Sequence, residues 1–361
     1  MKEDEFNKQD NSFEEDKDNE DNKTYPIKEA KIEKQRFSVF ELKRKIDSGN
    51  IIIDPDFQRE NVWDEKRKSE LIESILMGIP IPLIYTSQSN DGKMQIVDGK
   101  QRLSSLREFL NNKFELTGLK ILNTINKKTF DKLDNFQKTK IEDYMFDIYM
   151  IVPPTPDEIK FDIFDRVNRG GVPINAQEMR NALYNGVATE VIKQLCKSED
   201  FQKAAGDPDK SRMKDRYLAL RFLAFYLLFN SKLNFAYTTL DTFLGKVMSF
   251  INKECKYENF NELTANFDIA MSFIYKQYKD DLFRFSPKEE GKKRRKVSLA
   301  LFESLSFAFI LSLENKKKYP DVKKIDEFKK ILDAPEKTIL GVDGWPNIEN
   351  RFHLAKGLLD D

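Results

Sequence analysis

The sequence has very little of the residues that most often bind metals or form disulfides. Among 361 residues it has one histidine, His353, and two cysteines, Cys196 and Cys255. A single histidine excludes a histidine-rich metal nuclease site, and two distant cysteines indicate neither a zinc site nor a disulfide framework. The sequence also has no Gly-x-x-x-x-Gly-Lys-Ser/Thr motif, so any nucleotide chemistry would have to proceed without a P-loop.

Long hydrophobic runs are also missing. The two longest apolar stretches, 219–229 and 297–313, are interrupted by Arg221 and Glu303 and fall short of a membrane span. The amino terminus has no apolar core of the kind found in signal peptides. We therefore expect a cytoplasmic protein without a membrane partner, in which both stretches form buried helices.

Net charge is absent too, because 61 Lys and Arg balance 61 Asp and Glu. The balance is uneven, since residues 1–24 hold ten acidic and four basic residues and leave the rest of the chain mildly basic. A segment whose large apolar residues are only Phe6 and Phe13 cannot bury enough surface to fold. We expect residues 1–35 to be a disordered acidic tail. An alternative is that this acidic tail mimics nucleic acid and covers a basic surface of the rest of the chain.

The rest of the sequence has the composition of a folded protein, with 40% hydrophobic residues and 29 Phe. Apolar runs at 51–53, 83–86, 94–97 and 144–152 predict strands, and helical periodicity separates several of them. From about residue 177 onward only helical periodicity is found, and the polar stretch 203–212 is the best candidate for a hinge or boundary. The pattern predicts an α/β domain followed by an all-α domain.

The strongest functional signal lies where the strand predicted at 94–97 turns directly into a helix. Apolar residues at helical spacing from Leu103 to Leu110 place the start of this helix near Lys100. A helix start presents unpaired backbone N–H groups and the positive end of the helix dipole, which together favour a phosphate group. An ordinary strand–turn–helix joint has the same pattern. The residues expected at this site are Asp98, Gly99, Lys100, Gln101 and Arg102.

Two further polar clusters lie on either side of this motif in the sequence. Their arginines would supply more cations for a polyanionic ligand, although an ion pair or a helix cap would explain each of them equally well. The second cluster is followed by a helix that carries Glu178, Arg180 and Asn181. The clusters are 57–63, with Gln58 and Arg59, and 164–171, with Arg166 and Asn168.

Taken in this order, the three clusters resemble the domain-of-unknown-function family 262. Its members include the small-subunit part of the modification-dependent GmrSD restriction enzymes and the amino-terminal part of a phosphorothioation-linked phage-defence nuclease. The family is similar in fold to ParB and sulfiredoxin, and its usual signature is Asp-Gly-Gln-Gln-Arg. Here Lys100 replaces the first Gln of that signature, while the other four residues are retained. The resemblance implies a ParB/sulfiredoxin-like domain at 36–175 and a helical domain at 176–361.

The resemblance also implies a function. It suggests a nucleotide-binding, NTP-hydrolysing regulatory component of a DNA-targeting restriction or phage-defence system. The nuclease would be a separate subunit, because no His-Asn-His nuclease domain is encoded. In this picture Asp98 positions Mg²⁺ or another divalent metal, or the attacking water, and Gln101 and Arg102 complete the catalytic set. The residues expected to hold the nucleotide are Gln58, Arg59, Gly99, Lys100, Arg166 and Asn168.

Two alternatives remain open from the sequence. The first is a non-enzymatic DNA-binding sensor, in which the same cations and the basic run 292–296 contact backbone phosphates. The second is a metal-dependent, ParB-like nuclease that uses Asp98. The sequence does not identify the nucleotide, the DNA modification, the metal or the oligomeric state.

Overall fold

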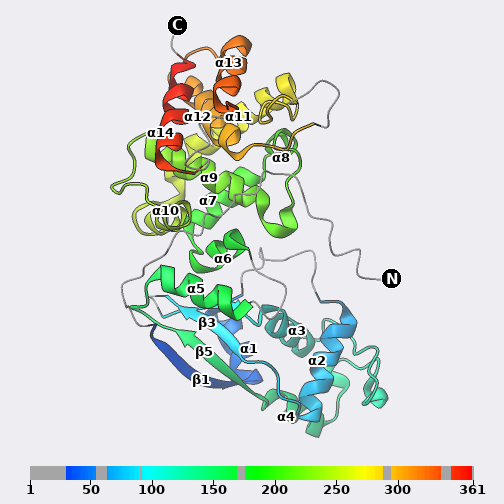
Figure 1. Cartoon of the computed structure of the whole chain (residues 1–361). Helices are drawn as coiled ribbons and strands as arrows, with labels where there is room; N and C mark the ends of the chain where they lie inside the picture. Colours follow the sequence, from blue (N-terminus) through cyan, green and yellow to red (C-terminus); the bar gives the residue numbers. More distant parts are fainter. Residues whose placement is uncertain are drawn as a thin grey trace. The chain divides into compact units, whose positions relative to one another are not determined.

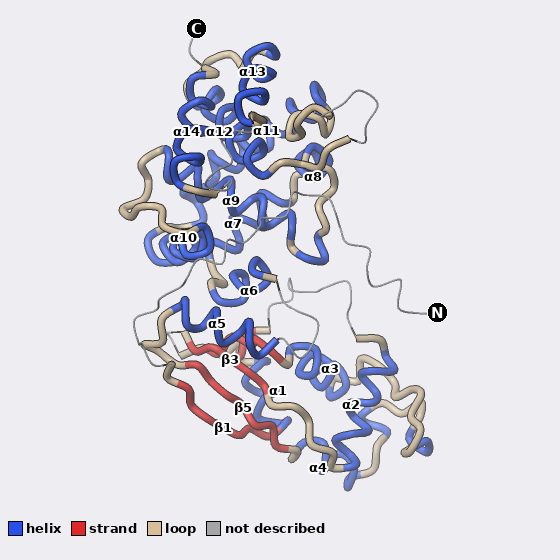
Figure 2. Tube along the Cα trace, in the orientation of Figure 1, coloured by secondary structure: helices blue, strands red, loops and turns tan. Residues whose placement is uncertain are grey.

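The computed structural model describes residues 30–53, 63–89, 92–168, 175–287, 294–334 and 343–359. The chain divides into two compact units between Leu183 and Tyr184. The first unit is mixed α/β and the second is helical, which confirms the predicted fold class (Figures 1 and 2).

The first unit is built on a five-stranded mixed sheet with the order β1-β5-β3-β4-β2. β1 with β5 and β3 with β4 are antiparallel, whereas β3 with β5 and β2 with β4 are parallel. Its elements are β1 (Ile32–Ser38), α1 (Val39–Asp47), β2 (Ile51–Ile52), α2 (Glu65–Met77), β3 (Ile84–Gln88), β4 (Met94–Asp98), α3 (Lys100–Leu110), α4 (Asn135–Glu142), β5 (Met145–Ile151), α5 (Asp157–Asn168) and α6 (Ala176–Leu183).

Both faces of this sheet are covered by helices. The side chains of β5 alternate between the two faces of the sheet. Phe146 and Ile148 lie on one face, in the larger of the unit's two hydrophobic cores, which also contains apolar residues of α1, α2 and α3. Ile151 instead joins Phe164 of α5 and Met179 of α6 in a smaller core on the other face. The end of β4 therefore lies between two layers of helices.

Local sequence signals explain where the first helices begin and end. Ser38 and Glu41 form a capping box at the start of α1, because the Ser38 hydroxyl accepts from the Glu41 N–H and the Glu41 carboxylate accepts from the Ser38 N–H. Gly78 ends α2 with φ +72°, a conformation that glycine adopts without a steric penalty. The strands predicted at 83–86 and 94–97 correspond to β3 and β4, which pair as an antiparallel hairpin.

Three features differ from the sequence expectation. Residues 32–35 belong to β1 rather than to an acidic tail, and their mostly exposed side chains give an edge strand no apolar pattern to recognise. α6 packs with the α/β unit because Met179 is buried against its sheet, so the units divide after α6 rather than at 175. The stretch 203–212 lies inside the helical unit and marks no boundary between units.

The second unit packs its helices around one large aromatic core. As predicted, the runs at 219–229 and 297–313 form buried helices, and within them Phe222, Phe225, Leu305 and Phe309 are fully buried. Within the described residues, no helix is long and apolar enough to cross a membrane. The helices are α7 (Val187–Cys196), α8 (Glu199–Ala204), α9 (Lys214–Phe229), α10 (Leu240–Glu254), α11 (Asn261–Tyr278), α12 (Leu299–Glu314), α13 (Val322–Leu332) and α14 (Trp345–Gly357).

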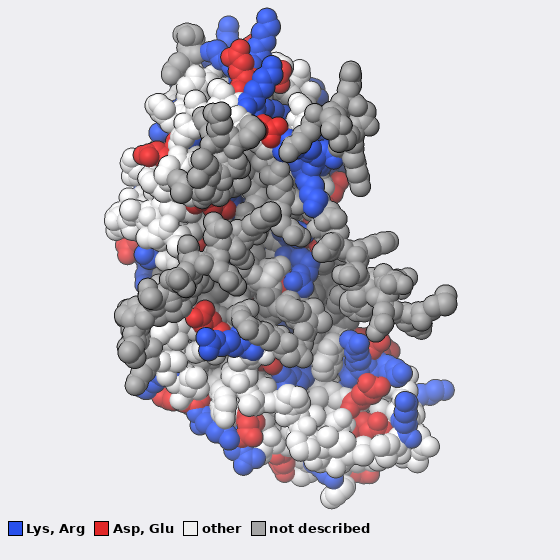
Figure 3. All heavy atoms as spheres, viewed as in Figure 1, with Lys and Arg blue, Asp and Glu red and all other residues white. Residues whose placement is uncertain are grey.

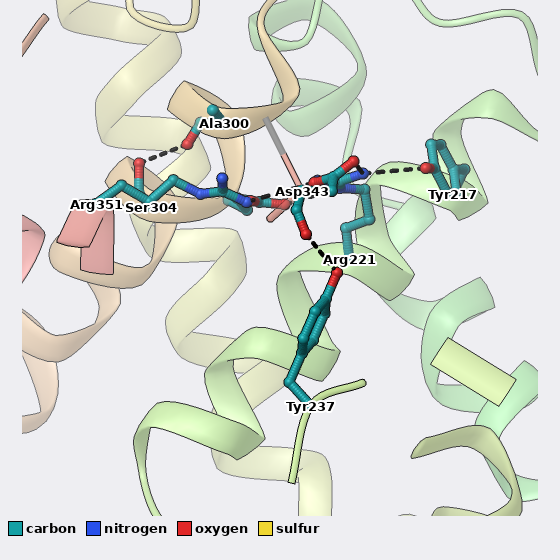
Figure 4. Close-up of polar contacts among 8 residues, drawn as sticks. Tyr217, Arg221, Tyr237, Ala300, Ser304, Asp343 and Arg351 are labelled. Carbon is teal, nitrogen blue, oxygen red and sulfur yellow. Dashed lines mark hydrogen bonds and ion pairs between the residues drawn. The ribbon is translucent and has the colours of Figure 1, made fainter. Parts of the chain in front are cut away.

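A buried ion network joins three of these helices (Figure 4). Glu303 of α12 is fully buried and accepts from Arg221 Nε of α9 at 2.8 Å and from Arg351 of α14. Asp343, just before α14, accepts from Arg221 Nη1 at 3.2 Å. Arg221 Nη1 also donates to the Tyr217 hydroxyl at 3.1 Å. Each buried charge therefore has an opposite charge in contact, as burial in a low-dielectric core requires.

Candidate phosphate-binding site

The motif at 98–102 adopts the predicted strand–turn–helix geometry. β4 ends at Asp98, Gly99 is the residue that caps the helix, and α3 begins at Lys100. The first N–H groups of an α-helix have no partner within the helix, and Gly99 has no side chain to cap them. The start of α3 therefore has the backbone arrangement that binds anions in many proteins.

Gly99 is required at this turn for two reasons. Its φ of +96° lies in the left-handed region, which residues with a side chain rarely adopt. A Cβ at this position would also lie 2.8 Å from Ile84 Cγ1 and 3.2 Å from Arg102 Nη2. The backbone of the turn therefore passes close to β3 and to the Arg102 side chain, and any larger residue would displace it.

Arg102 holds the neighbouring Asp98 in place. Its Nη2 donates to Asp98 Oδ2 at 2.7 Å, and its Nη1 donates to the backbone carbonyls of Leu83, at 3.2 Å, and Pro82. The Arg102 side chain is 10% exposed, whereas that of Asp98 is 39% exposed. This geometry gives Arg102 an orienting role at the turn and leaves the carboxylate of Asp98 accessible. Direct contact between Arg102 and a ligand remains a prediction.

Gln101 connects the motif to the first of the other clusters. Its Oε1 accepts from the backbone N–H of Trp63 at 3.3 Å, so the carboxyl end of the 57–63 cluster lies at the head of α3. The Trp63 side chain packs against the larger core of the unit. Gln58 and Arg59 lie outside the described residues.

The third cluster approaches β4 from the opposite face of the sheet. Phe164 and Met179 pack in the same small core as Val97, which directly precedes Asp98. Arg166 is exposed in the last turn of α5. Asn168 ends this helix, and its side chain lies outside what the structure describes. Of the two other clusters, Trp63 thus contacts the start of α3 through Gln101, and Phe164 packs in the same small core as Val97.

Tyr85 belongs to this site but was not identified from the sequence. It is paired with Asp98 in the β3–β4 ladder, and its ring packs edge-on against Tyr149 with centroids 5.7 Å apart. Burial raises the pKa of the Tyr85 phenol, and the nearby Tyr149 and Asp98 raise it further. The phenol is therefore a protonated hydrogen-bond donor at neutral pH. A tyrosine in an apolar strand looks like a core residue in the sequence, and only the hairpin register could have placed it opposite Asp98.

The structure gives no support for a metal centre made of protein side chains alone. Among the described residues, no three His, Cys, Asp or Glu side chains gather to hold a metal ion. His353 is exposed on α14. A metal at Asp98 would therefore need other ligands, such as phosphate oxygens and water, which is the usual arrangement for Mg²⁺.

In the basic run 292–296, Arg294 and Arg295 are paired with carboxylates of the helical unit. Arg294 pairs with Asp280 at 2.7 Å, and Arg295 pairs with Asp333 at 2.6 Å and lies over the ring of Phe285. Figure 3 shows Lys and Arg interspersed with Asp and Glu on the visible face of both units. This part of the run is built into the helical unit by ion pairs.

Comparison with known protein families identifies a domain in the first unit. Residues 39–185 match the family model of the GmrSD restriction endonuclease N-terminal domain. The matched segment begins with α1 and ends just after α6, so it contains all three clusters of the candidate site. No curated protein and no solved structure matches the chain. The match supports a GmrSD-type N-terminal domain in the first unit.

Proposed function

We propose that this chain binds a nucleoside triphosphate at the start of α3 and serves as the regulatory component of a DNA-targeting restriction or phage-defence system. One observation carries the proposal. An uncapped helix start, with Gly99 in the left-handed conformation, lies beside an oriented carboxylate in a domain that matches that of a restriction endonuclease. Nucleotide phosphates fit such a helix start because its N–H groups and dipole favour negative charge.

Asp98 is the residue best placed to act on the phosphates. Only Arg102 bonds to its carboxylate among the described residues, and it does so through Oδ2. Oδ1 is therefore left for a water or a divalent cation. Mg²⁺ commonly combines one or two carboxylates with phosphate oxygens and waters. When bound, it would neutralise developing charge on the phosphates, while Asp98 holds the ion or the attacking water.

The other predicted residues take supporting roles in this proposal. The Oε1 of Gln101 is occupied by Trp63, so its Nε2 is the end that would orient a water or a phosphate oxygen. Lys100 lies at the first position of α3 and adds positive charge there. Gln58, Arg59, Arg166 and Asn168 are proposed as further phosphate contacts.

The two alternatives have less support from the described residues. A DNA sensor needs cations free to meet backbone phosphates, but Arg294 and Arg295 are paired with carboxylates of their own unit. A metal-dependent, ParB-like nuclease that uses Asp98 would have to complete its metal site with other ligands, because no group of three His, Cys, Asp or Glu gathers in the described part of the chain. We therefore propose that DNA cleavage belongs to a separate nuclease subunit.

The test is a thermal-shift panel of ATP, GTP, CTP and UTP, each with Mg²⁺ and with EDTA. A ligand at a hundred times its dissociation constant stabilises the folded protein by about 2.7 kcal/mol, so at least one nucleotide should raise the Tm by several degrees. The variant Asp98→Asn should fold normally and lose Mg²⁺-dependent hydrolysis of that nucleotide. A wild-type protein that no nucleotide stabilises, or an Asp98→Asn variant with parental turnover, would contradict the proposal.

A further inference from the structure

Tyr85 is held directly at the turn that forms the candidate phosphate site. It is the second residue of β3 and is paired with Asp98, the last residue of β4. Ile84, the residue before it, lies against Gly99, since a Cβ on Gly99 would be 2.8 Å from Ile84 Cγ1. Two successive residues of β3 are therefore in register with the end of β4 and with the residue that caps α3.

A β-bulge brings two residues of β4 opposite Tyr85. Thr86 is paired with Ile96, so the register shifts by one residue between Thr86 and Tyr85. Val97 therefore has no partner on β3 and lies with Asp98 opposite Tyr85. Residues directly opposite in an antiparallel pair have Cβ atoms about 4.5–5.5 Å apart. Bulges are frequent next to active sites, where they redirect a side chain, and this one brings Tyr85 beside Asp98.

The hydroxyl of Tyr85 has no partner within the described part of the chain. The side chain is partly exposed, and its ring packs against the smaller core and edge-on against Tyr149. The hydroxyl makes no hydrogen bond to any residue that the structure describes. The charge of Asp98 acts on it, since Asp98 contributes, after burial and Tyr149, to the raised pKa of this phenol. Packing thus fixes the ring and leaves its hydroxyl for a ligand beside Asp98.

We propose that the Tyr85 hydroxyl binds the nucleotide by donating a hydrogen bond to a phosphate oxygen held beside Asp98. The inference rests on the proposed function, which places phosphates at the start of α3. A phenol has an ordinary pKa of about 10, so it is a donor at neutral pH. A hydrogen bond to an anionic oxygen is about twice as strong as one between neutral groups. A donor on a ring that is already fixed also loses little conformational entropy on binding.

The experiment compares nucleotide affinity and ligand-free stability in Tyr85→Phe, which removes only the hydroxyl. Dissociation constants are measured by calorimetry, with Mg²⁺, for the nucleoside triphosphate that gives the largest thermal shift. Loss of a hydrogen bond to a charged group should weaken binding about tenfold or more. Inorganic tripolyphosphate, used as a competitor, should lose affinity by the same factor. Without ligand, the variant should melt within about 1 °C of the wild type, because the lost hydroxyl has no partner among the described residues.

The matched control is Tyr149→Phe. Tyr149 is the other ring of the edge-on pair, but it lies on β5, which is separated from β4 by β3. Tyr149 is therefore one strand farther from Asp98 than Tyr85 is. Removal of its hydroxyl should leave the nucleotide affinity unchanged.

The outcomes separate this inference from the proposed function. If the wild type binds nucleotide and Tyr85→Phe binds equally tightly, the role of Tyr85 is refuted while the nucleotide site stands. An equal loss of affinity in Tyr149→Phe, or a clearly lower Tm of ligand-free Tyr85→Phe, would also refute it, because the effect would then come from packing of the ring pair. If nucleotide binding weakens but tripolyphosphate binding does not, the phosphate assignment is refuted. If no nucleotide binds the wild type, both proposals fail.

Discussion

Neutralising Glu303 should destabilise the helical unit more than any single surface change. Its carboxylate is fully buried and contacts both Arg221 and Arg351, so Glu303→Gln leaves two buried guanidinium groups to share Asp343. Breaking a buried ion pair by removing one partner costs about 3–5 kcal/mol. At roughly 2–4 °C per kcal/mol for a unit of this size, the Tm should fall by about 6–20 °C.

Differential scanning calorimetry of the full-length protein measures this change. The control is Glu199→Gln, which removes the exposed pair with Lys203 and should cost no more than about 1 kcal/mol. If Glu303→Gln melts within about 1 °C of the wild type, the buried network does not hold α9, α12 and α14 together, and the reasoning is refuted.

Three further outcomes are expected. Arg102→Lys should lower the Tm and weaken nucleotide binding, because an ammonium group cannot bond to Asp98 and to the carbonyls of Leu83 and Pro82 at the same time. An unchanged Tm would refute the orienting role of Arg102. Lys100→Gln restores the usual family signature and should keep nucleotide hydrolysis within a few-fold of the wild type in a turnover assay. Removal of residues 1–29 should preserve cooperative melting, since β1 begins at Ile32, and a lost transition would contradict this.

Part of the fold could be predicted from the sequence, because the local signals for helix starts and strands agree with the pattern of buried residues. The capping box of Ser38 and Glu41 fixed the start of α1, and the apolar runs before Asp98 became the β3–β4 hairpin. β1 could not be predicted, because an edge strand with exposed side chains carries no apolar alternation. Its place in the sheet comes from long-range pairing with β5, which one sequence does not reveal.

At the candidate site, the strand–turn–helix geometry could be predicted from the sequence, whereas the contacts of the side chains could not. The turn at Gly99 and the helix start at Lys100 follow from residue types and spacing. The orienting role of Arg102 depends on carbonyls about twenty residues earlier in the chain, and the place of Tyr85 opposite Asp98 depends on the register of the β3–β4 hairpin. Such contacts arise from tertiary structure, so an arginine that binds a ligand and one that braces a turn look alike in the sequence.

Hydrogen–deuterium exchange with and without the nucleoside triphosphate that gives the largest thermal shift tests the central claim most directly. If phosphates bind the N–H groups at the start of α3, peptides that cover residues 98–103 should exchange more slowly when nucleotide and Mg²⁺ are present. Peptides from the surface of the helical unit should change little. Nucleotide binding that leaves exchange at 98–103 unaltered, or that protects other segments alone, would contradict the account.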